Sequence, residues 1–335
     1  MVLYNTLSAV ERAKLIDEAG KDRITISFYK YHLIQYPAAF RDELYLAWER
    51  LDVLGRIYVS DEGINAQLSV PAENFHRFEA HLDSYDFMQG MRLNVAVEHD
   101  NKSFLKLKIK VRKKIVADGI EDPSFDASRI GKHLKASEFN AIIENEKTIL
   151  VDMRNHYESE IGHFKNAILP QVETFRESLD LITSDLASHK NDKQIVMYCT
   201  GGIRCEKASA YFLHQGFKEV YQLEGGIIEY LRQVKAETLE NKFKGKNFVF
   251  DQRRAERISD DTVSTCHQCN AISDTHTNCR NNACNILFIQ CAACSDKWNG
   301  CCSQKCMDII ALPFEKQKAL RKGSSIKRRY FKKER

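Results

Sequence analysis

The stretch QIVMYCTGGIR, residues 194–204, decides how the centre of this chain folds. Its apolar start leads directly into Cys199, and a helix-like pattern follows Arg204. This order predicts a strand, a tight loop that two glycines allow to close, and the start of a helix. Backbone N–H groups at a helix N-terminus converge and favour negative charge, so a cysteine there loses its proton easily. The loop therefore predicts a cradle for a nucleophilic sulfur or for a bound anion.

The sequence around this loop alternates between short apolar strands and helical patterns. Strand-like runs lie at 148–152, 194–199 and 219–223, and helix-like segments lie between them. Such alternation indicates a doubly wound parallel sheet with helices on both faces. Sites in these sheets lie at the C-terminal ends of the strands, which is where Cys199 stands.

The N-terminal third has a different order of elements. Its segments are predicted to form a strand, a helix, two strands, a helix and a strand, at residues 24–31, 37–54, 56–60, 64–70, 71–85 and 91–97. This β-α-β-β-α-β order is typical of the ferredoxin-like arrangement, so we expect an α+β domain ahead of the α/β unit.

Length and composition predict a protein of several domains. The 335 residues, of which 43% are hydrophobic, are enough for two or three separate cores. No apolar run approaches the ~18 residues of a membrane-spanning helix, and the N-terminus lacks an apolar signal core. We therefore expect a cytoplasmic protein with no membrane partner. No pattern indicates the oligomeric state.

Basic residues gather in two segments of the chain. From Glu315 to Arg335, ten lysines and arginines stand against two glutamates, a net charge of +8 in a chain of net charge +4. Earlier, four cations alternate with apolar residues and so share one face of a predicted strand: Lys106, Lys108, Lys110 and Arg112. Solvation explains both segments as well as a polyanionic partner does. The functional interpretation is contact with an RNA backbone, whose phosphates relieve the repulsion between like charges.

Nine of the eleven cysteines lie between residues 266 and 306, which predicts a metal-binding module. In a chain without a signal peptide, clustered cysteines are more often metal ligands or reduced thiols than disulfides. Two pairs have the CxxC spacing of a tetrahedral zinc site: Cys266 with Cys269, and Cys291 with Cys294.

The five remaining cysteines of this region supply a second Cys₄ set and leave over one of Cys301 and Cys302. The set that we adopt is Cys279, Cys284, Cys302 and Cys306. His267 and His276 are alternative ligands. We expect structural zinc, because this segment has too few apolar residues to fold by burial alone. An iron–sulfur cluster and metal-free thiols stay open as alternatives.

Three motifs in sequence order resemble those of the rhodanese domain. They are Asp152-Met153-Arg154 followed by Gly162-His163, the CxxGxR loop 199–204, and Leu223-Glu224-Gly225-Gly226. The resemblance implies that Cys199 is a persulfide-forming nucleophile and that Arg204 helps to hold an anionic group. The expected organisation is then a ferredoxin-like domain, a rhodanese domain, a cysteine-rich metal-binding module and a basic tail, at residues 1–122, 126–240, 245–312 and 313–335.

The chain up to about residue 312 also resembles a narrower family, the bacterial tRNA uridine hydroxylases known as TrhO. The resemblance is carried by ISFYKY (26–31), EGINAQ (62–67), CTGGIRCEKASAY (199–211), EGGIIEY (224–230) and KNFVFD (246–251). It implies oxygen-dependent formation of 5-hydroxyuridine at the tRNA wobble position, with tRNA as partner and molecular oxygen as co-substrate. An organic cofactor stays unknown, since the chain has no G-x-G-x-x-G fingerprint.

Other functions of the cysteine loop stay open at this point. A sulfurtransferase would pass persulfide sulfur to an acceptor without any hydroxylation. A non-catalytic adaptor would only bind RNA, although the intact loop counts against it. A phosphatase is disfavoured, because four residues separate Cys199 from Arg204 where phosphatase loops have five.

Several neighbouring residues have two interpretations each. Cys205 either resolves a persulfide as a disulfide with Cys199 or faces the core. His163 is more easily explained as a fold-stabilising histidine than as a general base, and Asp152 and Arg154 are expected to hold the shape of the site.

Residues of the N-terminal domain are also candidates for ligand contact. Tyr29 and Tyr31 are candidates for stacking on RNA bases, as is Phe28, although alternation turns at least one of the three into the core. Glu62 and Asn65 belong to a predicted turn and are weaker candidates.

Overall fold

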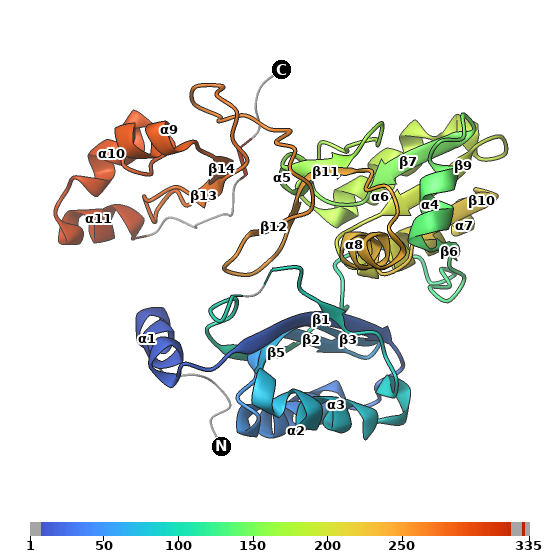
Figure 1. Cartoon of the computed structure of the whole chain (residues 1–335), viewed down its shortest axis with the longest axis horizontal. Helices are drawn as coiled ribbons and strands as arrows, with labels where there is room; N and C mark the ends of the chain where they lie inside the picture. Colours follow the sequence, from blue (N-terminus) through green and yellow to red (C-terminus); the bar gives the residue numbers. More distant parts are fainter. Residues whose placement is uncertain (1–7, 99, 323–329, 332–335) are drawn as a thin grey trace.

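The N-terminal part is built on a five-stranded sheet with the strand order β4-β1-β3-β2-β5. The computed structural model describes residues 8–98, 100–322 and 330–331. In chain order the elements of this part, blue to teal in Figure 1, are α1 (Ala9–Ala19), β1 (Arg23–Tyr31), α2 (Pro37–Arg50), β2 (Leu54–Ser60), β3 (Gly63–Pro71), a 3-10 turn (Ala72–Asn74), α3 (Phe75–Asp83), a second 3-10 turn (Asp86–Met88), β4 (Asn94–Val95) and β5 (Leu107–Val111). The order β1-α2-β2-β3-α3-β4 confirms the predicted ferredoxin-like arrangement.

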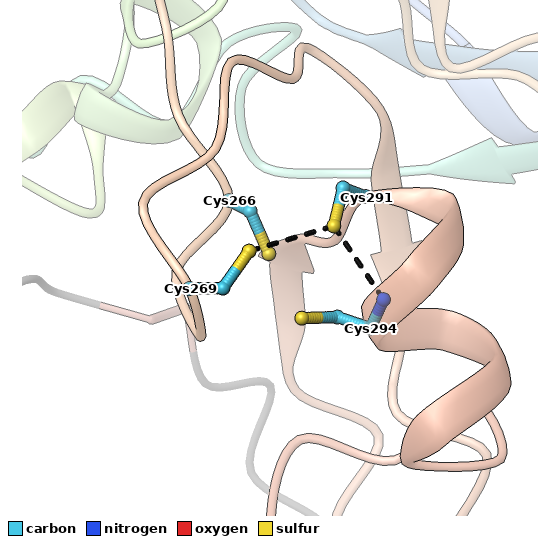
Figure 2. A group of neighbouring side chains, drawn as sticks. All are labelled: Cys266, Cys269, Cys291 and Cys294. Atoms are coloured by element: carbon cyan, nitrogen blue, oxygen red, sulfur yellow. Dashed lines mark hydrogen bonds between the residues drawn. The ribbon is translucent and has the colours of Figure 1, made fainter.

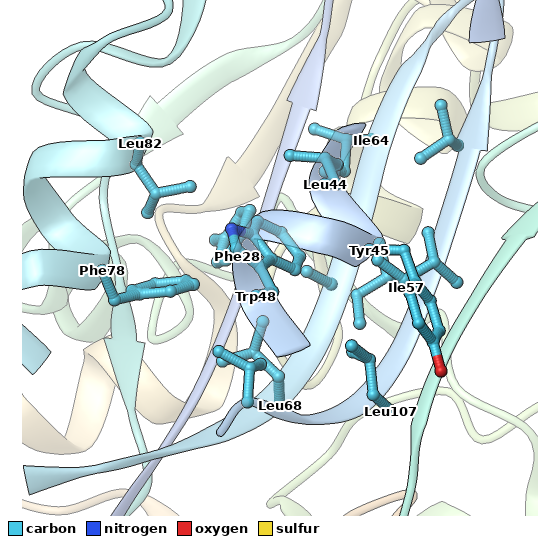
Figure 3. Packing of buried hydrophobic residues seen from close by; sticks show 14 of the residues in the cluster. Phe28, Leu44, Tyr45, Trp48, Ile57, Ile64, Leu68, Phe78, Leu82 and Leu107 are labelled. Carbon is cyan, nitrogen blue, oxygen red and sulfur yellow. The ribbon is translucent and has the colours of Figure 1, made fainter. Parts of the chain in front are cut away.

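Alternation along β1 separates the two faces of this sheet. Phe28 points into the core, where its ring meets the Trp48 ring edge-on at 6.5 Å and the Phe78 ring at 6.3 Å (Figure 3). Helices α2 and α3 cover this face of the sheet (Figure 1). Tyr29 and Tyr31 therefore lie on the opposite face, here called the open face, which no described helix of the N-terminal part covers and which faces the central part of the molecule.

Two of the predicted strands are shorter or less regular in the structure. β4 pairs with β1 only at Asn94 and Val95, which leaves most of the predicted strand 91–97 irregular. In β5, Leu107 and Ile109 are buried as the alternation predicts, but Val111 is 39% exposed. The apolar face of β5 is therefore buried over fewer residues than predicted. β5 is an edge strand with only β2 beside it, so its end is less well covered.

The central part contains a four-stranded parallel sheet with the order β6-β10-β9-β7. Its elements are β6 (Lys132–Leu134), α4 (Ala136–Ile142), β7 (Thr148–Asp152), α5 (His156–Ser159), β8 (Gly162–Phe164), α6 (Phe175–Asp185), a 3-10 turn (Ala187–His189), β9 (Gln194–Tyr198), α7 (Ile203–His214), β10 (Glu219–Leu223) and α8 (Gly226–Glu237). Phe139 of α4 and Tyr230 of α8 belong to one core, and Leu179 of α6 and Phe212 of α7 to another. The sheet is therefore doubly wound, as predicted.

The C-terminal part returns to the central part before it forms its own cysteine-rich unit. β11 (Phe243–Phe248) pairs antiparallel with β8 and with β12 (Ala255–Arg257). The later elements, orange to red in Figure 1, are β13 (His276–Asn278), β14 (Leu287–Ile289), α9 (Ala292–Lys297), α10 (Gln304–Ile310) and α11 (Phe314–Arg321).

The basic tail is described only in part. Residues 313–322, which include α11, and Tyr330 with Phe331 are described, whereas 323–329 and 332–335 lie outside the described residues. Tyr330 forms a β-bridge with Leu287, and the Phe331 N–H donates to the Leu287 carbonyl at 3.1 Å. Within the described residues, no helix has the length and apolarity to cross a membrane.

The open face of the N-terminal sheet covers the start of α7 in the central part. The Tyr29 hydroxyl donates to Glu206 Oε1 at 3.0 Å, and the Asn94 amide donates to the Gly201 carbonyl at 3.4 Å. Buried Lys207 donates to Glu62 Oε2 at 2.6 Å and lies 3.7 Å from Asp118. The two parts are thus joined by polar contacts at the loop that the sequence singles out.

Substitution of Lys207 tests this junction. The Lys207 side chain is 5% exposed, so Lys207→Ala leaves Glu62 without its cation and leaves the fully buried Asp118 with Lys114 alone. We expect the free energy of unfolding in urea to fall by about 3 kcal/mol. The control is Lys14→Ala, which removes an exposed ion pair with Glu18. We expect this variant to change the free energy of unfolding by less than about 0.5 kcal/mol. Equal losses in both variants would show that the junction adds no stability.

Candidate active site

Cys199 lies at the point where β9 ends and the loop to α7 begins. Its side chain is fully buried, and its Sγ accepts a hydrogen bond from the Gly202 N–H at 3.2 Å. The Cys205 thiol and backbone N–H also contact this sulfur. Gly202 has φ +99°, which turns its N–H toward the sulfur in a conformation that favours glycine. The predicted cradle is therefore present, with donors on several sides of a single sulfur atom.

The surroundings of Cys199 favour its thiolate. Burial opposes ionisation, but the hydrogen bond from the Cys205 thiol, the Arg204 charge and the backbone donors outweigh it and lower the pKa of Cys199 to about 6. Burial and the neighbouring Cys199 thiolate raise the pKa of Cys205 well above its ordinary value. At neutral pH Cys199 therefore carries the negative charge and Cys205 keeps its proton.

Arg204 already has a carboxylate partner. Its guanidinium donates to both oxygens of Glu158, at 2.6 and 2.8 Å, and to Thr200 Oγ1 at 3.4 Å. It also lies over the Phe250 ring, 5.9 Å from the ring centre. Glu158 in turn accepts from the Asn155 N–H at the start of α5, which fixes its position. Arg204 therefore contributes a fixed positive charge beside Cys199, and Glu158 occupies both of its terminal nitrogens.

The N-terminus of α8 holds the loop from the other side. The Ile227 N–H donates to the Cys199 carbonyl at 3.0 Å, and the Ile228 N–H donates to the Thr200 carbonyl at 3.3 Å. At Gly226, whose φ is +67°, a Cβ atom would lie 2.5 Å from the Cys199 carbonyl oxygen. Gly226 of the EGGIIEY motif is therefore needed for the close approach of α8 to the loop.

The residues expected to support the site form their own contacts. Arg154 pairs with Asp152 at 2.7 Å and donates to the Gly162 carbonyl at 2.6 Å, with both charged side chains fully buried. His163 donates from Nδ1 to the Ser159 carbonyl at 2.8 Å, the contact of a fold-stabilising histidine. The side chains of Asp152, Arg154 and His163 do not lie within hydrogen-bonding distance of Cys199.

The aromatic residues of β1 have a different role from base stacking. Phe28 lies in the core, and the Tyr29 and Tyr31 hydroxyls bind Glu206 and the Ile203 carbonyl above the loop. Glu62 and Asn65 likewise bind protein groups, the N–H and carbonyl of Ile115. Base stacking by these tyrosines is therefore wrong for this arrangement. The sequence contains no local signal for a contact between two domains.

The first set of cysteines gathers into one cluster (Figure 2). Cys266 and Cys269 come from the loop before β13, Cys291 caps α9, and Cys294 lies in its first turn. Their sulfur atoms lie within 4.8 Å of one another, and Cys269 and Cys291 approach to 3.6 Å. The Cys294 N–H donates to the Cys291 sulfur at 3.5 Å. Four soft thiol ligands at this spacing are the donor set of a structural zinc or iron–sulfur site.

The second set gathers in the same way and interleaves with the first along the chain. Its sulfur atoms also lie within 4.8 Å of one another, and its members are Cys279, Cys284, Cys302 and Cys306. Cys301 is buried outside both clusters. The alternative ligands bind elsewhere: His267 contacts Glu160 at 2.6 Å, and buried His276 stacks edge-on against Phe248.

Two of the four cations of the alternating segment, Lys108 and Lys110, lie in β5 on the sheet face that covers the cysteine loop, and Lys106 and Arg112 flank this strand. Lys110 of β5 pairs with Tyr58 of β2, in the same row of the sheet as Tyr29. Lys108 pairs with Arg56, a fifth cation on this face that the sequence analysis misses because strand pairing is not a local signal. Lys108 and its cationic neighbours lower the pKa of Lys110. Like charges are therefore held together here, as an anion-binding surface requires.

Fold and site together define a class of protein: a rhodanese-like domain joined to a second α+β domain and a cysteine-rich unit. Family models match each part in turn. Residues 23–115 match the UPF0176 acylphosphatase like domain, residues 135–233 match the rhodanese-like domain, and residues 244–307 match the rhodanase C-terminal domain.

Curated relatives extend the similarity to nearly the whole chain. A tRNA uridine(34) hydroxylase from Leptospira interrogans is 53% identical over 99% of this chain and 90% of its own length. The enzymes of the same name from Pectobacterium carotovorum and Yersinia enterocolitica are 55% and 54% identical over 96% of this chain, and 91% and 92% of their own lengths. The chain therefore belongs to the tRNA uridine(34) hydroxylase family, which confirms the resemblance found in the sequence.

Substitution of Cys205 tests the origin of the low Cys199 pKa. Cys205→Ala removes one hydrogen bond to the thiolate, so the pKa of Cys199 is expected to rise from about 6 by about one to two units. The thiolate then forms only at higher pH. Ultraviolet thiolate absorbance during a pH titration, taken as the difference from Cys199→Ser, measures this pKa.

The matched control keeps a donor at the same position. Cys205→Ser retains a hydroxyl that donates to the sulfur, so its titration is expected near that of the unaltered protein. If the alanine and serine variants titrate at the same pH, the Cys205 thiol does not stabilise the thiolate.

Proposed function

We propose that this protein hydroxylates uridine 34 of tRNA, forming 5-hydroxyuridine at the wobble position, and that Cys199 is its reactive residue. The observation that carries the proposal is a thiolate held by a glycine loop at the start of α7, in a chain of this family over nearly its whole length. Molecular oxygen is the co-substrate that the family resemblance implies. A tRNA substrate also supports a cytoplasmic location.

The residues around Cys199 have distinct roles in this proposal. Cys199 supplies the nucleophile, since a pKa of about 6 keeps it ionised at neutral pH. Cys205 holds a proton beside it that it could return. If Cys199 carried a persulfide, attack of the Cys205 sulfur on the Cys199 sulfur would form a disulfide between the two and release the outer sulfur as hydrosulfide. Arg204, fixed by Glu158, keeps the site electropositive enough for a buried anion.

The anionic substrate fits the charge distribution of the sheet face. We assign contact with the RNA backbone to four residues of the alternating segment: Lys106, Lys108, Lys110 and Arg112. The assignment is supported by Lys108 and Lys110, which continue the sheet face that covers the Cys199 loop, and by the position of Lys106 and Arg112 at the two ends of the same strand. The basic tail, as far as it is described, adds further cations on α11.

Zinc is the metal that we assign to both cysteine clusters. The residues that would hold it are Cys266, Cys269, Cys291 and Cys294 in one cluster, and Cys279, Cys284, Cys302 and Cys306 in the other. Complete thiol sets with backbone N–H groups donating to sulfur fit a closed, structural site. When bound, zinc would supply folding free energy to the C-terminal unit.

Sulfur transfer is a second candidate function. It is favoured by the four-residue gap between Cys199 and Arg204, which suits one transferred sulfur atom better than a tetrahedral oxyanion, and by the donors that stabilise the Cys199 thiolate. Two observations count against a phosphatase. The loop is too short to surround a phosphate group, and Arg204 is already bound to Glu158 in a bidentate pair.

Mass spectrometry of tRNA nucleosides tests the proposed reaction. Cells that lack the protein are expected to lose oxygen-dependent 5-hydroxyuridine and its derivatives, and Cys199→Ser is expected to leave them at the level of the deletion. Cys301→Ser serves as the matched control, because Cys301 lies outside the loop and both clusters. Unchanged 5-hydroxyuridine in the Cys199 variant would refute the proposal. Cysteine-dependent thiocyanate formation from thiosulfate and cyanide would then favour sulfur transfer.

Metal content tests the zinc assignment. The purified protein is expected to contain two zinc ions per chain, one for each cluster. Cys269→Ser is expected to lower this to one by removing a ligand, whereas Cys301→Ser keeps two. Elemental mass spectrometry gives the stoichiometry. Bound iron in place of zinc, or equal loss in both variants, would contradict the assignment.

A further inference from the structure

A cavity of about 400 Å³ lies where the three parts of the molecule meet. Its walls come from β2 and β5 of the N-terminal part, from Tyr157 of the central part and from the segment after β11. Its volume falls in the range of about 300–1,000 Å³ that is typical of pockets for small molecules. The roles assigned so far to Cys199, Arg204 and Cys205 do not use it.

One side of this cavity is aromatic. Its lining includes Phe104, Tyr157, Phe248, Phe250 and Tyr330. The rings of Tyr157 and Tyr330 stack face to face, with centres 3.8 Å apart and planes 5° from parallel. Phe248 meets the Tyr157 ring edge-on at 5.4 Å. Flat aromatic faces of this kind are the surfaces on which unpaired nucleobases stack.

Another part of the cavity wall is cationic. Arg56, Lys106 and Lys108 line it, and within the described ranges none of the three has a carboxylate within 4 Å. The acidic residue in the lining, Asp251, is bound by Arg253 and so has its charge balanced. The cavity therefore combines aromatic faces with unpaired positive charge, the two properties that together recognise a nucleotide.

We propose that this cavity binds one nucleotide of the single-stranded anticodon loop, with its base against the aromatic wall and its phosphate toward Arg56, Lys106 and Lys108. This inference rests on the proposed function, because the substrate class comes from there. It adds a place for the nucleotide and the residues that hold it.

The cavity is connected to the cysteine loop through shared walls. A smaller hollow of about 50 Å³ is lined by Thr200 of the loop and shares Phe104, Val249 and Phe250 with the larger cavity. Phe250 is also the ring over which the Arg204 guanidinium lies. A nucleotide in the cavity is therefore placed beside the residues that surround Cys199.

Photochemical cross-linking tests the location directly. An anticodon stem-loop that carries 4-thiouridine at the wobble position is irradiated with the full-length protein, and the cross-linked peptide is identified by mass spectrometry. We expect it to contain Tyr157, residues 248–252 or Tyr330. A cross-link confined to other parts of the chain overturns the proposal, and if hydroxylation persists in the same preparation, the proposed function still stands.

Binding of the same stem-loop by variants tests the two walls separately. Tyr330→Ala is expected to weaken binding about tenfold, the effect of losing one stacking surface, whereas Tyr330→Phe keeps the ring and the affinity. Tyr36→Ala, which alters an exposed aromatic outside the cavity and away from the assigned RNA contacts, is the matched control and should not change affinity. Lys108→Ala is expected to lower the slope of log affinity against log salt by about one. Unchanged affinity in Tyr330→Ala and an unchanged salt slope in Lys108→Ala together overturn the proposal.

Two further outcomes separate this inference from the proposed function. If the cavity cross-links to the stem-loop but tRNA from deletion cells keeps its 5-hydroxyuridine, the nucleotide site is supported and the reaction is not. If free 4-thiouridine monophosphate cross-links in the cavity and the stem-loop does not, the cavity is a mononucleotide site and the proposal for RNA is wrong.

Discussion

The structure depends on keeping one ionised sulfur atom away from water. A buried charge is costly unless fixed donors replace its hydration. Here the donors are the Gly202 N–H and the thiol and N–H of Cys205, at the N-terminus of α7. Arg204 adds a positive charge, and its own pairing with Glu158 keeps that charge in place. The glycines, the close approach of α8 and the covering sheet can all be explained as conditions for this one stabilised anion.

Features of the fold and site that depend on neighbouring residues could be predicted from the sequence. The apolar run before Cys199 and the glycines after it define strand, loop and helix, and cysteine spacing indicates which thiols converge. Contacts between distant segments could not be predicted. Glu158 binds Arg204, and Tyr157 stacks on Tyr330, across gaps that carry no periodic signal. The covering of Cys199 by Tyr29 and Tyr31 belongs to the same class, because a domain junction depends on surface shape rather than local pattern.

Because the two cysteine clusters interleave along the chain, the folding of one is coupled to the folding of the other. The segment with Cys279 and Cys284 lies in the chain between the two pairs of the first cluster, and that with Cys291 and Cys294 lies between the two pairs of the second. Each cluster therefore closes a loop that contains half of the other. Ordering of either one restricts the chain available to its neighbour, so the C-terminal unit is expected to fold as one cooperative body around both.

The complete burial of Cys199 makes its reactivity a property of the whole molecule. A reagent reaches the sulfur only when the residues that cover it move, and a shift of the N-terminal sheet would break the contacts of Tyr29 with Glu206 and of Glu62 with Lys207. The rate of such a reaction is then the intrinsic rate multiplied by the fraction of molecules that are open at any moment. An acidic thiol that would otherwise be oxidised readily is thus protected while it is buried, and chemical modification of this atom becomes a measure of how often its cover opens.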